Sequence, residues 1–196
     1  MCIRDRPEVA GKLEDWALRK IQFRNSDTDL WVTSIIQEGN FQIMFPSAPE
    51  KITESSESAM GTIEHYTYRV EPEVGTDDNL AYAVTCMTYP PAMINSRVIS
   101  NEQVDQFLKY TIEGLEKRSG SKLISEKTIA YGLFPGKEIR MDYENGLAEI
   151  KCRLYLVKNT LYALKVTSAT QKRENKARDF FLNSFKLLEY ADAGKP

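Results

Sequence analysis

The chain has 196 residues, of which 42% are hydrophobic and 28% are charged, and its formal net charge is −2 at pH 7. This length and composition are typical of one globular domain with a substantial core, and they exclude an intrinsically disordered chain. The near-balance of charges excludes the strongly basic surface that nucleic acids or anionic lipids require, and no stretch reaches the roughly 18 apolar residues of a membrane-spanning helix.

The first 29 residues differ in character from the rest. Residues 1–6, MCIRDR, resemble the translation of a transposon end used to prepare sequencing libraries, so we interpret them as a non-native leader. On this interpretation Cys2 carries no chemistry, and the presence of an export signal stays open; if the leader is native, we expect cytoplasmic localisation. Residues 7–24 place apolar side chains at helical spacing, which predicts a short amphipathic helix followed by a polar linker up to residue 29.

The next segments predict a β-hairpin and a loop. Residues 30–36 are rich in β-branched side chains, and residues 41–45 alternate apolar with polar residues until Pro46. Such segments on either side of a short polar turn are typical of paired antiparallel strands. The polar residues 54–58 predict a loop after the hairpin.

Two more strands are expected before the first helix of the main domain. Residues 62–70, after Gly61, are strand-like, with Tyr66, Tyr68 and Val70 on one face. Residues 80–89 are apolar on both faces, which favours a strand inside a sheet that is covered on both sides. Ser100 and Gln103 then form a capping-box pattern, which predicts the start of a helix with an apolar stripe that ends at Gly120.

The C-terminal half predicts a meander of strands. Residues 123–130 are strand-like, and Phe134-Pro135-Gly136 fits a type II turn. Asn145-Gly146 is a strong signal for a two-residue hairpin turn. Alternating apolar residues on either side of that turn and of Lys158-Asn159 predict three strands in sequential order, namely residues 139–143, 150–156 and 162–166.

A second helix is expected at the C-terminus, because apolar residues recur at helical spacing. Its predicted stripe consists of Ala177, Phe180, Phe181, Ser184, Phe185 and Leu188. The basic run 172–178 is interrupted by Glu174, so we interpret it as a solvated helix face. The whole order predicts an α+β fold with a mostly antiparallel β-sheet flanked by helices, as a single domain over residues 30–190 with a tail at 191–196.

Catalytic motifs are not evident in the sequence. The single histidine, His65, lies in a predicted strand, and a hydrolase that uses it with Glu64 or Glu138 is the enzymatic alternative. Cys86 and Cys152 lie in strand-like apolar runs, which favours buried thiols over a disulfide. We expect no metal and no cofactor, and we interpret Glu138 and its neighbouring carboxylates as a solvated strand face.

Aromatic residues on strands offer the best candidate for a contact surface. Tyrosine combines a large apolar ring with a hydroxyl, so tyrosines gathered on a sheet face can bind a ligand or a partner. The residues that we expect to contribute are His65, Tyr66, Tyr68, Tyr89, Lys137 and Tyr143.

Short motifs in order along the chain resemble the PsbP-like superfamily, in particular its bacterial PsbP- and DcrB-type proteins, over residues 41–188. The motifs are Phe41–Pro49, Gly61, Thr88–Pro90, Lys122–Glu126, Pro135–Glu138, Arg153–Leu156, Asn159–Tyr162 and Phe181–Phe185. The resemblance implies an α/β/α sandwich without a catalytic residue set. Its bacterial members are commonly exported or tethered to a membrane by an N-terminal segment.

The sequence thus favours a non-enzymatic binding or assembly-supporting module, with the bacterial cell envelope as the location that the resemblance implies. The expected partner is a protein or a small molecule and not a nucleic acid, and membrane contact would come only from an N-terminal anchor. The alternatives are the hydrolase that uses His65 and a cytoplasmic protein-binding domain.

Overall fold

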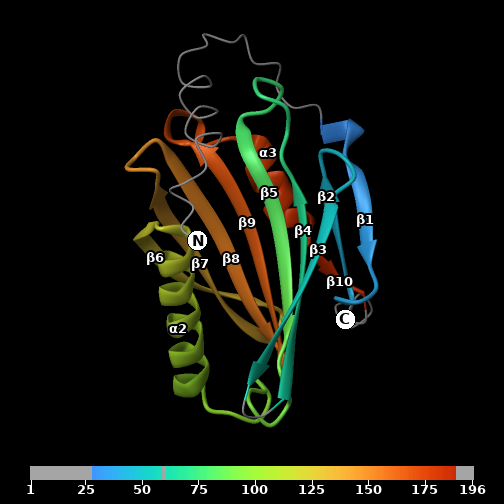
Figure 1. The fold of residues 1–196 in the computed structure, drawn as a ribbon, viewed down its shortest axis with the longest axis vertical. Helices are drawn as coiled ribbons and strands as arrows, with labels where there is room; N and C mark the ends of the chain where they lie inside the picture. The colour runs from blue at the N-terminus through green and yellow to red at the C-terminus, as the bar shows by residue number, and fades with distance from the viewer. Residues whose placement is uncertain (1–27, 59–60, 189–196) are drawn as a thin grey trace.

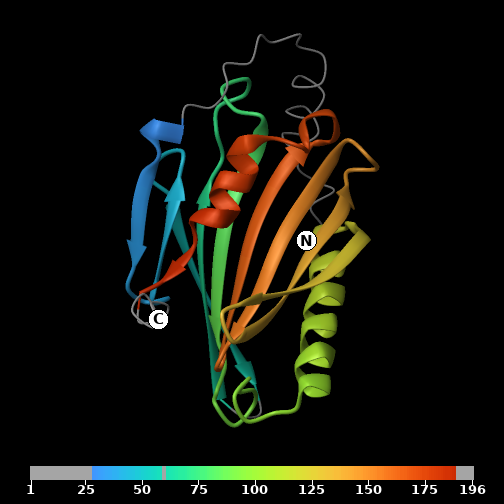
Figure 2. The same cartoon turned by 180° about the vertical axis from the view of Figure 1, so that it is seen from behind.

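The structure is a computed structural model that describes residues 28–58 and 61–188. A large twisted sheet forms the centre, with helix α2 on one face and helix α3 together with a small sheet on the other (Figures 1 and 2). The expected fold class is therefore confirmed: the chain is α+β, and its mostly antiparallel sheet is flanked by helices. The predicted helix at 7–24, its linker and the tail at 191–196 lie outside the described residues.

The large sheet has seven strands in the order β3-β4-β5-β9-β8-β7-β6, and every neighbouring pair is antiparallel. Its strands are β3 (Glu50–Ser58), β4 (Gly61–Val70), β5 (Asn79–Thr88), β6 (Lys122–Tyr131), β7 (Phe134–Tyr143), β8 (Ala148–Val157) and β9 (Thr160–Ala169). The predicted meander is confirmed as β7-β8-β9. The predicted interior strand is confirmed as β5, which lies between β4 and β9.

The small sheet has three strands in the order β1-β2-β10. The predicted hairpin is confirmed as β1 (Val32–Ile36) paired with β2 (Phe41–Phe45), and β10 (Lys186–Leu187) pairs with the other edge of β2. A 3-10 turn, η2 (Thr28–Leu30), precedes β1, and another, η3 (Thr170–Lys172), follows β9. The two ends of the described chain therefore meet in one small sheet.

The two α-helices of the described residues begin at side-chain caps. For α2 (Asn101–Ser119), Ser100 and Gln103 form the predicted capping box, and Gly120 ends the helix in the left-handed conformation. For α3 (Lys176–Ser184), the Asn175 side chain accepts a hydrogen bond from the Arg178 backbone. Within the described ranges, neither helix combines the length and the apolar composition that a membrane crossing needs.

Each face of the large sheet has its own core. On one face, Val104, Leu108 and Ile112 of α2 pack against alternate residues of β7, β8 and β9. On the other face, α3 and the small sheet pack against the intervening residues. That core contains Phe41, Ile43, Phe45, Tyr68, Tyr82, Val84, Tyr155, Tyr162, Leu164, Val166, Phe181 and Phe185.

Residues 54–58 are not the predicted loop but the second half of β3. Each residue from Glu50 to Glu57 is exposed, so the strand has no apolar face that alternation could reveal. Its backbone pairs with β4 along nine residue pairs. Hydrogen bonding to a neighbouring strand, rather than burial of side chains, makes this segment a strand.

The predicted type II turn at Phe134–Gly136 is also wrong. The hairpin turns at Gly132 and Leu133, where Gly132 has φ 58°, and β7 begins at Phe134. Gly136 lies inside β7, where a Cβ atom would overlap the Leu154 carbonyl oxygen and the Tyr155 ring. Glycine is needed there for close backbone approach and not for a positive φ.

The Asn145-Gly146 turn is confirmed, with φ 54° and 90° at its two residues and a hydrogen bond from the Leu147 backbone to the Glu144 carbonyl. The ladder around it begins only at the pair Tyr143–Ala148, so the connection is wider than two residues. At the C-terminus, α3 ends at Ser184, and Phe185 is extended. Leu188 therefore lies beyond β10 and not on the helical stripe predicted for it.

Candidate functional site

The six residues predicted to form a contact surface lie on two faces of the large sheet. Tyr66 and Tyr68 are on the face of the small sheet, where Lys51 lies 5.0 Å and 5.9 Å from their ring centres. Lys51 also forms an ion pair with Glu38 at 2.5 Å, and Tyr68 donates a hydrogen bond to Glu38. His65 projects from the opposite face because it alternates with these tyrosines.

The other three predicted residues are on the face of α2. Tyr89 packs edge to face against Phe107 at 5.3 Å, and Tyr143 is half-buried beside the core under α2. Lys137 is buried and forms ion pairs with Asp105 at 2.5 Å and Glu126 at 2.7 Å. The six residues therefore do not converge on one surface, and Lys137 serves to tie α2 to β6 and β7.

The carboxylates considered as partners of His65 point away from it. Glu64 precedes His65 in β4 and accepts a hydrogen bond from Tyr66, on the other face. Glu138 also lies on that other face, where Arg153 donates a hydrogen bond to it at 2.6 Å. His65 Nε2 instead lies 3.3 Å from Ser56 Oγ on the exposed β3-β4 hairpin, and burial lowers its pKa.

Cys86 and Cys152 are both buried and are not bonded to each other. They belong to different cores, on opposite faces of the sheet. Burial raises the pKa of Cys86 to about 11 and that of Cys152 to about 12. Both thiols are therefore protonated at neutral pH and lack the reactivity of a thiolate.

The free edge of β1 is the first part of a better candidate. No described strand pairs with its outer edge, and it lies at the rim of the molecule in both views (Figures 1 and 2). Val32 is 43% exposed and Ile35 is 57% exposed. The edge strands β3 and β6 carry several charged residues, which discourage pairing with other chains, whereas β1 (VTSII) carries none.

A groove of about 380 Å³ lies between the small sheet and α3, on the β2 side of β1. Its walls are Thr33 from β1, Gln42, Ile43 and Met44 from β2, Phe180, Asn183 and Ser184 from α3, and Lys186 from β10. Ile35 pairs with Gln42 and Thr33 pairs with Met44, so the exposed Ile35 shares the face of the groove. We call the β1 edge and this groove the edge-groove surface.

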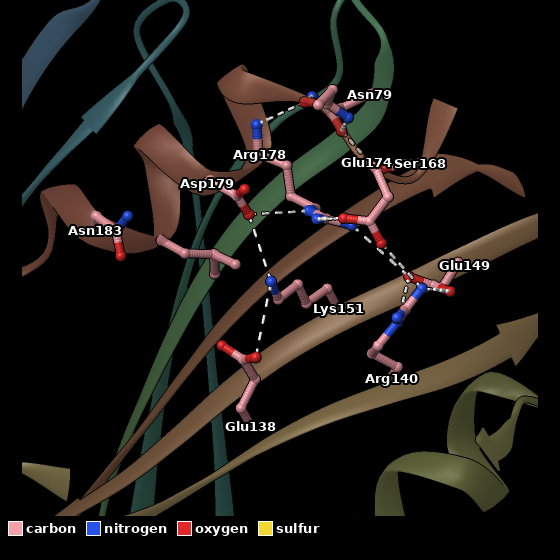
Figure 3. Close-up of polar contacts among 12 residues, drawn as sticks. Asn79, Glu138, Arg140, Glu149, Lys151, Ser168, Glu174, Arg178, Asp179 and Asn183 are labelled. Carbon is pink, nitrogen blue, oxygen red and sulfur yellow. Dashed lines mark hydrogen bonds and ion pairs between the residues drawn. The ribbon is translucent and has the colours of Figure 1, made fainter. Parts of the chain in front are cut away.

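An ion network fixes α3, which forms one wall of the groove, against β7 and β8 (Figure 3). Arg140 binds Glu149 through two hydrogen bonds of 2.9 and 2.7 Å, and Arg178 lies 3.8 Å from the same carboxylate. Arg178 also binds Glu174 at 2.7 Å. Arg178 is only 2% exposed, so the interpretation of residues 172–178 as a solvated face is wrong at this position.

The C-terminal end of α3 is fixed in the same way. Arg153 donates hydrogen bonds to the Leu182 carbonyl at 3.1 Å and to the Asn183 side chain at 2.8 Å, and it also binds Glu138. The Ser184 hydroxyl accepts a hydrogen bond from the Met44 backbone of β2. Asn183 and Ser184 are thus held in place where they line the groove, and Glu138 is half-buried and paired rather than solvated.

A buried polar cluster holds the other end of α3. Asn79 binds Asp77, Asn175 and Ser168 through hydrogen bonds of 2.6 to 3.0 Å, and Tyr82 donates to Asp77 at 2.9 Å. Because Asn175 is also the N-cap of α3, the cluster connects the start of that helix to β5 and β9. Burial raises the pKa of Asp77 above its ordinary value.

The ion pairs of Glu138 should make the free energy of unfolding depend on pH. Burial alone would raise its pKa, but the hydrogen bond from Arg153 and the charge of Lys151 hold the pKa below its ordinary value of 4.5. Its contribution to stability is therefore complete above that value and is lost as the pH falls through the folded-state pKa. We expect the difference in unfolding free energy between the wild type and Glu138→Gln to shrink between neutral and acidic pH; a constant difference in urea titrations would contradict this.

Two signals for this site were present in the sequence. Arg178 is one residue from Ala177 and three from Phe181, so its spacing places it on the apolar stripe of the helix. The segment 32–36 is the second signal, because it is an apolar strand without a charged residue. That β1 forms an edge follows from the pairing of β10 with the other side of β2. This pairing joins residues far apart in the chain, so no local sequence pattern reveals it.

Comparisons with known proteins find little beyond the arrangement of elements. No family model matches the chain, and no curated protein matches it. The solution structure of cyanobacterial PsbP (CyanoP) from Synechocystis is similar with a TM-score of 0.44 and 9% identity, covering 80% of this chain and 92% of that chain. A Pseudomonas aeruginosa protein of unknown function, described as a candidate regulator, is similar with a TM-score of 0.34 and 8% identity, covering 72% of this chain and 85% of that chain. We derive neither a family nor a function from these similarities.

Proposed function

We propose that the protein is a non-enzymatic binding module that holds an extended segment of another protein along the free edge of β1. The observation that supports this proposal most is the uncharged β1 edge with its exposed Val32 and Ile35. An added strand would satisfy the outward backbone groups of β1, and its alternate side chains would lie over Ile35 and the groove. Anchors at both ends of α3 keep the groove in shape before a partner arrives, which lowers the entropic cost of binding.

The chain offers a matched pair of sites for a crosslinking test. Ile35 on the β1 edge is 57% exposed and Ile124 on the β6 edge is 58% exposed, so a photoreactive amino acid at either position meets solvent equally. We expect a discrete protein adduct from position 35 and none from position 124. Equal adducts from both positions would contradict the proposal.

Purified partner from that experiment then allows an affinity measurement. Ile35→Lys should weaken binding by about tenfold or more, equivalent to about 1.4 kcal/mol, because a charge on this edge opposes strand addition. Ile124→Lys is the control and should leave the affinity unchanged. On binding, backbone amides of β1 should become protected from hydrogen exchange; protection elsewhere with β1 unaffected would exclude strand addition.

We further propose membership of the PsbP-like superfamily and a location in the bacterial cell envelope, on the basis of the motifs in the sequence. Fractionation of cells that express the natural gene would test the location, and recovery in the cytoplasmic fraction alone would favour the alternative of a cytoplasmic protein-binding domain.

His65→Ala should leave partner binding unchanged, since His65 lies on the other face of the large sheet.

A further inference from the structure

The groove of the edge-groove surface is floored by two rows of side chains from the small sheet. The register places Ile35, Gln42 and Lys186 in one row across β1, β2 and β10. Thr33 and Met44 form the neighbouring row, which is two residues along the strands and therefore about 7 Å away. Residues of both rows line the groove, so a ligand that lies along β1 meets the two rows one after the other.

The row of Thr33 and Met44 belongs to an apolar end. Phe180 of α3 packs edge to face on Trp31, which directly precedes β1, so Phe180 lies at this end of the groove. Met44 is half-buried, and its thioether side chain adapts easily to different apolar partners. A large apolar side chain of a partner therefore fits at this end.

The row of Gln42 and Lys186 belongs to a cationic end. Lys186 is the only charged residue among the described residues that line the groove. The side chains of Gln42 and Lys186 make no hydrogen bond or ion pair within residues 28–58 and 61–188. Arg153 donates to Oδ1 of Asn183 at 2.8 Å, which leaves the amide nitrogen of Asn183 as its free end. This end thus offers N–H donors and one positive charge.

Negative groups on this side of the large sheet are already compensated. Glu138 and Asp179 each form ion pairs with basic residues of β8. The C-terminal end of α3 carries negative partial charge, which would repel an anion. Arg153 offsets this charge, since it donates a hydrogen bond to the Leu182 carbonyl at 3.1 Å. Lys186 is therefore available to attract a negative group that a partner supplies.

We propose that the segment bound along β1 carries a glutamate two residues away from a large apolar side chain, and that Lys186 and Gln42 bind the glutamate carboxylate. This preference rests on the proposed function, because the partner has to add a strand to β1. Residues on one face of an added strand recur every second position, as the rows of the groove do. One residue therefore lies over the row of Thr33 and the next over the row of Ile35.

The length of the side chains selects glutamate at the cationic end. An added strand and β10 are separated by three strand spacings, about 14 Å. Lys186 and a glutamate have to extend toward each other over Gln42 to close this distance, whereas the shorter aspartate does not reach. The carboxylate then lies above Gln42, whose amide donates a second hydrogen bond to it.

Two labelled peptides with capped ends test the preference against the full chain by fluorescence anisotropy. One contains Glu-Val-Phe-Val-Glu and the other Gln-Val-Phe-Val-Gln, and both are symmetric, so either strand direction presents the same pattern. We expect the glutamate peptide to bind about threefold to fivefold more tightly, the range for an exposed ion pair. The difference should disappear in about 1 M salt, where the Debye length falls to about 3 Å.

A charge-removing variant identifies the cation. Lys186→Gln should abolish the preference for glutamate and change the affinity of the glutamine peptide less than twofold. Lys176→Gln removes the same charge from the exposed first turn of α3, at the other end of the helix, and should keep the preference. A preference that survives Lys186→Gln, or is lost equally in Lys176→Gln, would overturn the proposal.

Hydrogen exchange separates this preference from the proposed function. Both peptides should protect the backbone amides of β1, because strand addition does not depend on the carboxylate. Protection of β1 with equal affinities for the two peptides would overturn the glutamate preference and leave the proposed function supported. Absence of binding by either peptide would also overturn the preference, whereas a protein adduct from position 35 would still support strand addition.

Discussion

Glu149→Ala should lower the free energy of unfolding by about 3–5 kcal/mol, the range measured when one member of a buried ion pair is removed. Glu149 is only 4% exposed, and both Arg140 and Arg178 bind it. Without this carboxylate the two guanidinium groups face each other under α3, and among the described residues Glu174 and Asp179 at the surface are the carboxylates left to compensate them. Urea unfolding monitored by circular dichroism measures the loss.

Two variants make this result specific. Glu174→Ala removes a carboxylate from the same network, but its side chain is 65% exposed, so it should cost less than about 1 kcal/mol. The double replacement Glu149→Met with Arg178→Met should recover much of the loss, because paired apolar side chains can replace a buried ion pair. If Glu149→Ala and Glu174→Ala lower the free energy of unfolding by the same amount, the buried carboxylate of Glu149 is not what stabilises α3.

Phe181→Ala should cost about 3–5 kcal/mol, the usual range for truncation of a buried phenylalanine. Phe181 is completely buried, and its ring centre lies 5.2 Å from that of Phe45 and 5.3 Å from that of Tyr82. It is therefore the point at which α3, the small sheet and the large sheet meet. Thermal unfolding should show a lower Tm, and hydrogen exchange should increase first in β2.

The neighbouring Phe180 is the matched control. It is only partly buried, packs edge to face on Trp31 at 5.2 Å and lines the groove. Phe180→Ala should therefore cost clearly less stability than Phe181→Ala but should weaken the binding of the proposed partner. If Phe180→Ala were more destabilising than Phe181→Ala, the result would contradict the packing described here. If Phe180→Ala left binding unchanged, it would contradict the proposed binding surface.

The sequence predicted those parts of the fold in which local chemistry and tertiary structure agree. The meander of β7, β8 and β9 follows from alternation, since Ile150, Cys152 and Leu154 all face one core. The start and end of α2 follow from a capping box and a terminal glycine. Strand β3 could not be predicted in this way, because its side chains are exposed on both faces and only pairing with β4 makes it a strand.

The candidate site depends even more on contacts that local patterns do not contain. The charged neighbours of Arg178 in the sequence predict a solvated side chain, although Glu149 from a distant strand lies 3.8 Å from it inside the protein. The tyrosines predicted to share one surface lie on two faces of the large sheet, with Tyr66 and Tyr68 on one face and Tyr89 and Tyr143 on the other. The free edge of β1 depends on β10, whose two residues pair with β2 from the other end of the described chain.

That pairing has a consequence for synthesis. Met44 of β2 is bonded to Ser184, 140 positions later in the chain, so the small sheet cannot be completed until nearly the whole domain has left the ribosome. At roughly 5–20 residues per second, the β1-β2 hairpin waits on the order of ten seconds with both of its edges unpaired. During this interval both edges of the nascent hairpin lack a partner strand, whereas in the described fold β10 covers the second edge of β2, so the nascent hairpin exposes more unpaired backbone donors and acceptors than the folded one.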